Sequence, residues 1–224
     1  MERGKVPDPA ARRAGLLLII TAVATVVAVV GRVAAAADHP TLAKSLIAIS
    51  DSSGLYAIGG AARFIAGVTL IAGAWFLLRT WIIRQRLGTP LVPLLFVASG
   101  LFTAVSGAGA VALAAFAPDV GPATETAAAL RELTGKAGFA LGGLALIVAA
   151  RYQWKVGATL KRIAPVTAVI GIALQLIWFD AIIMLHMVTG AAFLVWLVVI
   201  GTMLFTGRVE RYFVAFLASA SPQH

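Results

Sequence analysis

The side chains that could do chemistry in this chain are few, and most of them lie near the ends of long apolar segments. Arg63 lies about a turn inside one such segment, and Gln175 lies deeper in another. His186 follows Asp180 by less than two helical turns at the start of the last segment. Polar residues at such positions are often functional, because burying them in lipid is costly. One interpretation is therefore that these four residues form a polar group suited to an anion or a polar headgroup, with neutral His186 as a proton acceptor.

The same four residues also have a structural interpretation, which we favour because polar groups near a membrane interface cost little. Arg63 can extend its guanidinium to water or pair with an acidic loop residue. Asp180 can cap a helix, and His186 can be an interfacial histidine with its hydrogen bonds satisfied. Gln175 can bond a neighbouring helix.

A transmembrane b-type haem would need two histidine ligands, and the chain has three histidines. His39 and His186 are expected at the same end of the apolar segments, so they form the conceivable pair, but no repeated spacing makes them specific. Cysteine is absent, which excludes disulfides and thiolate metal sites, and no catalytic signature is present. We therefore expect a non-enzymatic protein with no metal and no cofactor.

The elements that must position these residues follow from composition. The chain is 61% apolar and 12% charged, against about 25% charged in a soluble domain. The sequence predicts an all-α, polytopic transmembrane bundle forming a single domain, because six stretches supply the roughly 20 apolar residues that a span needs. The spans are expected at about 15–36, 60–83, 91–117, 135–152, 163–179 and 181–205.

The first span has an alternative interpretation as a secretory signal, since basic residues precede it and Ala34–Ala37 follow it. Its apolar run exceeds the usual length of such signals, so we expect the span to be retained.

The basic residues predict the orientation, because cytoplasmic loops carry the excess of Lys and Arg. All but five of the 18 Lys and Arg fall on the side that holds both termini. The exceptions are Arg32, Lys44, Arg63, Arg131 and Lys136. Both termini are therefore expected in the cytoplasm. The net charge of +9 mostly reflects this topology, with some attraction to anionic lipid, and no nucleic-acid partner is expected.

Two outer loops and several glycines complete the expected bundle. Residues 38–54 are expected to form a short surface helix, and residues 119–134 a small helical cap or a flexible loop. Small residues at helical spacing predict close helix contacts or a homodimer seam, and we favour contacts within the bundle. The glycines concerned are Gly138, Gly142, Gly171, Gly190 and Gly201.

Several short sequence patterns carry a resemblance to a family of proteins. They are the opening Arg13-Ala-Gly-Leu-Leu, Ala62-Arg63, Leu77-Leu78-Arg79 and the stretch from Gly190 through Trp196 to Gly201. The layout resembles an uncharacterised bacterial family of six-helix membrane proteins. The resemblance implies a bacterial inner-membrane protein and brings no activity with it.

Two functions follow as expectations. The first is an accessory or scaffolding subunit of a membrane protein assembly, since packing faces are abundant and catalytic residues are lacking. The alternative is a carrier or binding protein for a small hydrophobic or lipidic ligand, with a pocket toward the outer face. A b-type haem redox protein is the least favoured.

Overall fold

The structure is a computed structural model that describes residues 8–37, 39, 41–179 and 183–220. It is 88% helical and contains no strand in the described residues, as the sequence predicts. Six helices are long and apolar enough to cross a membrane. They are α1 (Pro9–Ala34), α3 (Ser53–Leu78), α5 (Leu91–Phe116), α6 (Pro122–Val156), α7 (Ala158–Ala173) with the 3-10 helix η1 (Leu174–Trp178), and α8 (Ile183–Phe205). Three shorter helices are α2 (Leu42–Asp51), α4 (Trp81–Arg84) and α9 (Arg208–Ala220).

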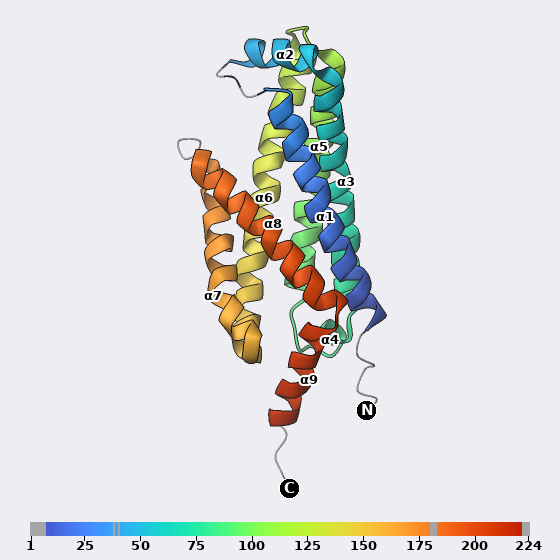
Figure 1. Cartoon of the computed structure of the whole chain (residues 1–224), viewed down its shortest axis with the longest axis vertical. Coiled ribbons are helices and arrows are strands. Elements are labelled where there is room, and N and C mark those ends of the chain that lie inside the picture. Colours follow the sequence, from blue (N-terminus) through green and yellow to red (C-terminus); the bar gives the residue numbers. More distant parts are fainter. Residues whose placement is uncertain (1–7, 38, 40, 180–182, 221–224) are drawn as a thin grey trace.

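The long helices pack in chain order, each against the one before it, and α8 returns to pack on α1 (Figure 1). The contact of α8 with α1 is far more extensive than its contact with α7. The start of α1 and the end of α9 lie at the same end of the molecule, which we call the terminal end. The opposite end carries α2 and is called the α2 end.

The helix α2 lies across the bundle at the α2 end (Figure 1) and falls within the surface helix expected for residues 38–54. The hydroxyl of Thr41 accepts the N–H of Lys44 and caps its first turn. Leu46 and Ile49 are buried and pack with Tyr56 of α3. These two apolar side chains fix α2 against the bundle.

Residues 119–134 were expected to form a small helical cap or a flexible loop, and residues 122–134 are helical but continue without a break as the first part of α6. Pro122 occupies the first turn, and the hydroxyl of Thr124 accepts the N–H of Gly121. The Ala-rich stretch that follows is a strong helix former, so the charged residues do not interrupt the helix. With 35 residues α6 is about 52 Å long, well beyond the ~30 Å of a hydrocarbon core.

Close backbone contacts join neighbouring helices at glycines. Gly171 of α7 lies against Gly143 of α6, where an added Cβ would come within 2.7 Å of the Gly143 carbonyl oxygen. Gly201 of α8 faces α1 and Gly138 faces α5, while Gly142 lies between Ser99 of α5 and Phe193 of α8. Among the described residues nothing lies within 4 Å of a Cβ built on Gly190. Four of the five glycines singled out in the sequence thus lie at contacts within the bundle.

Aromatic side chains of α8 pack in the interior of the bundle against α5. The ring of Trp196 lies 6.2 Å from that of Phe96 and 6.5 Å from that of Phe193, between centroids. Its indole Nε1 donates a 2.9 Å hydrogen bond to Thr167 Oγ1. This buried bond ties α8 to α7, where the helix contact is otherwise sparse.

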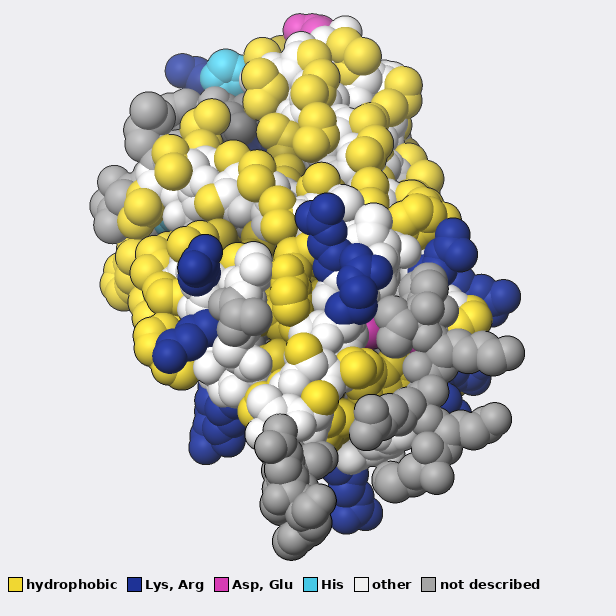
Figure 2. Space-filling view, turned by 60° about the horizontal axis from the view of Figure 1, so that its bottom comes forward, with side chains coloured by type: hydrophobic (Ala, Val, Ile, Leu, Met, Phe, Trp, Pro, Cys, Tyr) yellow, Lys and Arg dark blue, Asp and Glu magenta, His cyan; other side chains and the backbone are white. Residues whose placement is uncertain are grey.

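The outer surface of the helices is also apolar. Val30 and Val195, for example, are 60% and 63% exposed. Figure 2 shows hydrophobic side chains along the flank of the molecule, and Lys and Arg around the terminal end that comes forward. An apolar flank of this extent suits lipid rather than water, and it supports a multi-pass membrane protein.

Candidate functional site

Three of the four polar residues expected to act together, Arg63, Gln175 and His186, lie on α3, η1 and α8 near the α2 half of the bundle. The guanidinium carbon of Arg63 lies 5.8 Å from the centre of the Phe139 ring, and Nη2 lies beside Gly135. The Nε atom of Arg63 is buried and has no hydrogen-bond partner in the described residues.

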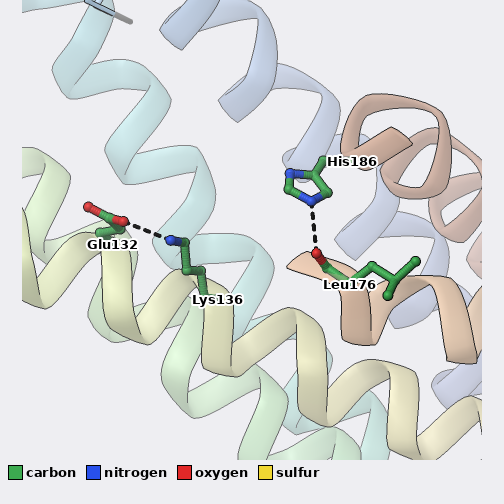
Figure 3. A network of polar contacts seen from close by, with 4 residues as sticks. All are labelled: Glu132, Lys136, Leu176 and His186. Carbon is green, nitrogen blue, oxygen red and sulfur yellow. Dashed lines mark hydrogen bonds and ion pairs between the residues drawn. The ribbon is translucent and has the colours of Figure 1, made fainter. Parts of the chain in front are cut away.

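Gln175 and His186 make backbone hydrogen bonds. Gln175 Nε2 donates to the carbonyl oxygens of Ala140 at 3.0 Å and Gly171 at 3.2 Å, which ties η1 to α6. His186 Nε2 lies 3.0 Å from the carbonyl oxygen of Leu176, a contact shown in Figure 3. Asp180, the fourth member of the expected group, lies outside the described residues.

Arg63 and Gln175 thus both contact α6 between Gly135 and Ala140. The same helix carries an ion pair between Glu132 and Lys136 at 2.9 Å (Figure 3). Since Gln175 joins two helices through backbone carbonyls, its contacts fit the packing role considered for it.

Haem ligation stays a prediction for His39 and His186. His39 is exposed beside Ser45, whose hydroxyl accepts its backbone N–H. The Nε2 atom of His186 would have to leave Leu176 before it could bind iron. In the described part of the chain no three His, Cys, Asp or Glu side chains gather in a way that could hold a metal ion.

A second site, which the sequence did not indicate, is an apolar cavity in the terminal half of the bundle. It has a volume of about 160 Å³ and is half open. Each of the six long helices contributes residues to its wall, although η1 contributes none. The short helices α4 and α9 also line it. Prominent apolar residues of the wall are Leu18, Phe96, Leu160, Trp196, Ile200 and Phe213.

The polar groups on the cavity wall are few. Thr80 Oγ1 donates to the carbonyl oxygen of Leu77 at 2.7 Å, and Thr89 Oγ1 accepts the N–H of Leu91 at 3.2 Å. Gln153 also lines the cavity, and its Oε1 atom is buried without a hydrogen-bond partner in the described residues. The cavity therefore offers a largely apolar surface with one free acceptor among its buried side-chain atoms.

A polar network borders the cavity where α9 meets α1 and α4. Val209 and Phe213 of α9 line the cavity, whereas Glu210 between them is fully buried on another side. Glu210 Oε1 accepts the backbone N–H of Asp8 at 2.9 Å. The Asp8 carboxylate in turn accepts the backbone N–H of Trp81 at 3.1 Å and caps α1.

The electrostatics of Glu210 follow from this setting. Burial raises the pKa of the Glu210 carboxyl, and the Asp8 carboxylate raises the same pKa further. The N–H of Asp8, the Trp81 indole and Arg211 oppose the rise by favouring the charged form. Neither Glu210 Oε2 nor Trp81 Nε1 has a well-formed hydrogen bond in the described residues.

Comparison with known proteins gives no further guide, because no family model, curated protein or solved structure matches this chain. The cavity and its surrounding polar groups are therefore the basis for a functional interpretation.

Proposed function

We propose that this protein is a non-enzymatic multi-pass membrane protein that binds a small hydrophobic or lipidic molecule in the cavity at the terminal end. The observation that carries the proposal is the cavity of about 160 Å³, whose wall combines residues from all six long helices with α4 and α9. An engineered, enclosed apolar cavity of about 150 Å³ lined by Leu, Ile and Phe binds benzene, which shows the size of molecule that such a volume accepts.

The size and the opening of the cavity limit the ligand. A compact ring or the end of an alkyl chain matches the volume, and the half-open wall leaves a way in from the surface. Lipid tails are as apolar as the cavity wall, so transfer from lipid alone gives little affinity. Shape and the few polar groups of the wall must therefore provide the selectivity.

The proposed ligand site lies toward the terminal end, whereas the sequence indicated a pocket at the outer face, which corresponds to the α2 end. Arg63, Gln175 and His186 make the local contacts described above, whereas the cavity lies among the terminal halves of the helices. With the terminal end in the cytoplasm, as the basic residues favour, the cavity lies at the level of the cytoplasmic leaflet of a bacterial inner membrane.

Binding of 4-fluorotoluene to the protein in lipid nanodiscs tests the proposal through ¹⁹F NMR. We expect a saturable shift beyond that of empty nanodiscs. Ala149→Phe should abolish it, because Ala149 lines the cavity and the added ring fills the volume. Ala137→Phe is the matched control, since Ala137 on the same helix is also half-buried but does not line the cavity. Binding that is absent, or equal in both variants, refutes the proposal.

A role as an accessory or scaffolding subunit is a second candidate, favoured by the surroundings of Gly190. A glycine with open space beside it allows a partner helix to approach closely. Met187, about one turn before it on the same helix, is 63% exposed. The partner would be another membrane protein that packs on α8.

Purification in mild detergent with native lipid tests this second candidate. Gly190→Leu should release a co-purifying subunit, whereas Ala61→Leu, at an exposed site on α3, should retain it. A protein that remains a lone monomer under these conditions contradicts the role.

A further inference from the structure

The polar atoms of the cavity wall restrict the chemistry of the molecule that fits it. Among the described residues, five buried side-chain nitrogen or oxygen atoms lack a hydrogen-bond partner. They belong to Tyr56, Arg63, Trp81, Gln153 and Glu210. Of these residues only Gln153 lines the cavity. The threonine hydroxyls on the wall are already engaged with the backbone.

A buried acceptor without a donor is unfavourable, because folding removed it from water without replacing the lost hydrogen bond. Gln153 lies on α6, four residues after Ala149, so its side chain lies on the same face as the cavity wall. A ligand that donates a hydrogen bond to Gln153 Oε1 regains the lost interaction, and a purely apolar ligand of the same shape does not.

The absence of charged residues from the wall limits which hydrogen-bond donor a ligand can carry. The lining residues include no Asp, Glu, Lys or Arg. An ammonium group would lose its hydration without meeting a counter-charge, which is far more costly than burying a neutral group. A hydroxyl is neutral, fits a small volume and both donates and accepts, so it can pair with either end of the amide.

On the basis of the proposed function, we infer that the cavity selects a neutral hydroxylated hydrophobic molecule, an alcohol or a phenol, whose O–H donates to Gln153 Oε1 while its apolar part fills the cavity.

Three probes of similar shape test this inference in nanodiscs by ¹⁹F NMR: 4-fluorobenzyl alcohol, its methyl ether and 4-fluorotoluene. Each affinity is corrected for partition into empty nanodiscs. The alcohol should bind about three- to tenfold more tightly than 4-fluorotoluene, the range expected for one net hydrogen bond. The methyl ether keeps an acceptor but has no donor, so it should show no such gain. This comparison uses the unmodified protein and needs no variant to fold.

Gln153→Met keeps the length of the side chain and removes its hydrogen-bonding groups. In this variant the preference for the alcohol should disappear, while 4-fluorotoluene binds at least as well as before. Gln85→Met is the matched control, because Gln85 is exposed and does not line the cavity, and it should keep the preference.

The outcomes separate the two proposals. If 4-fluorotoluene binds saturably and Ala149→Phe abolishes that binding, the cavity is a ligand site. Equal affinities for the alcohol and 4-fluorotoluene would then overturn the hydroxyl inference alone, as would a preference that persists in Gln153→Met. If none of the probes binds saturably, the proposed function fails as well.

Discussion

Glu210 is a buried carboxyl group in a polar network that holds α9 against the bundle. Its Oε1 atom accepts one hydrogen bond from the N–H of Asp8, and its side chain is fully inaccessible. The charged groups that affect it are the Asp8 carboxylate at the start of α1 and Arg211 on its own helix. Burial of such a group disfavours its charged form, so proton binding and the docking of α9 are linked.

We predict that Glu210 makes the protein more stable at acidic pH. The pKa of Glu210 is raised above its ordinary value of 4.5, so the folded state binds the proton more tightly than the unfolded state. The resulting stabilisation is present below pH 4.5 and is lost as the pH rises through the folded-state pKa. Glu210→Gln, which mimics the protonated acid, should remove this dependence. Thermal unfolding of both proteins from pH 4 upward measures the difference.

Glu125→Gln is the control for this experiment, because Glu125 is exposed in the first turn of α6. Its unfolding temperature should follow that of the unmodified protein across the pH range. Parallel curves for the unmodified protein and Glu210→Gln would contradict the assignment.

Individual polar residues were only partly interpretable from the sequence. The packing role considered for Gln175 fits its bonds to Ala140 and Gly171, since a mid-span amide most often bonds a neighbouring helix. Glu210 gave no signal, because a lone acid after the last span resembles any solvated residue. Its burial depends on the tertiary structure, which places Glu210 beside Asp8, the residue that caps α1.

At the scale of elements, the contact between α3 and α5 depends on the absence of a side chain at Gly67. A Cβ there would lie 2.5 Å from both the backbone nitrogen of Ala104 and the carbonyl oxygen of Gly100. We predict that Gly67→Ala destabilises the protein by about 1–3 kcal/mol, because two backbones must separate to admit the methyl group. The loss is measured by denaturant or thermal unfolding in one fixed detergent.

Gly54→Ala provides the comparison on the same helix. Nothing lies within 4 Å of a Cβ built at Gly54, so the substitution should be neutral or slightly stabilising through helix propensity. Equal losses in the two variants would show that the close contact at Gly67 is not what matters.

The long helices were predictable because hydropathy and length dominate their formation. The third span, expected at 91–117, is α5 at Leu91–Phe116. The fourth was expected to begin near Gly135, whereas α6 begins at Pro122. Hydropathy reports the part of a helix that suits lipid, and helix propensity reports where the helix itself begins, so the two boundaries need not agree.

At the scale of the whole molecule, the distribution of basic residues predicts which face of the membrane each end meets. The absence of native cysteine makes single-cysteine variants unambiguous reporters. We predict that a membrane-impermeant maleimide applied to intact spheroplasts labels Val120→Cys, between α5 and α6, but not Gln85→Cys, between α4 and α5. Both positions are exposed. Labelling of Gln85→Cys alone would invert the orientation.

The cavity could not be predicted from the sequence, because no local pattern specifies it. Its wall combines residues as distant as Leu18 and Phe213, and it exists only because α8 crosses toward α1 while α7 stays with α6. Such a gap depends on how the helices lean against one another, and hydropathy contains no information on that.

The return of α8 to α1 also has a consequence for biosynthesis. Gly15 of α1 fits against Gly201 of α8, so α1 leaves the ribosome well before the helix that packs on this face of it. Throughout the insertion of the intervening spans, that face of α1 meets only lipid or the insertion machinery. A nascent chain that stops after α7 therefore lacks the helix that covers this face of α1.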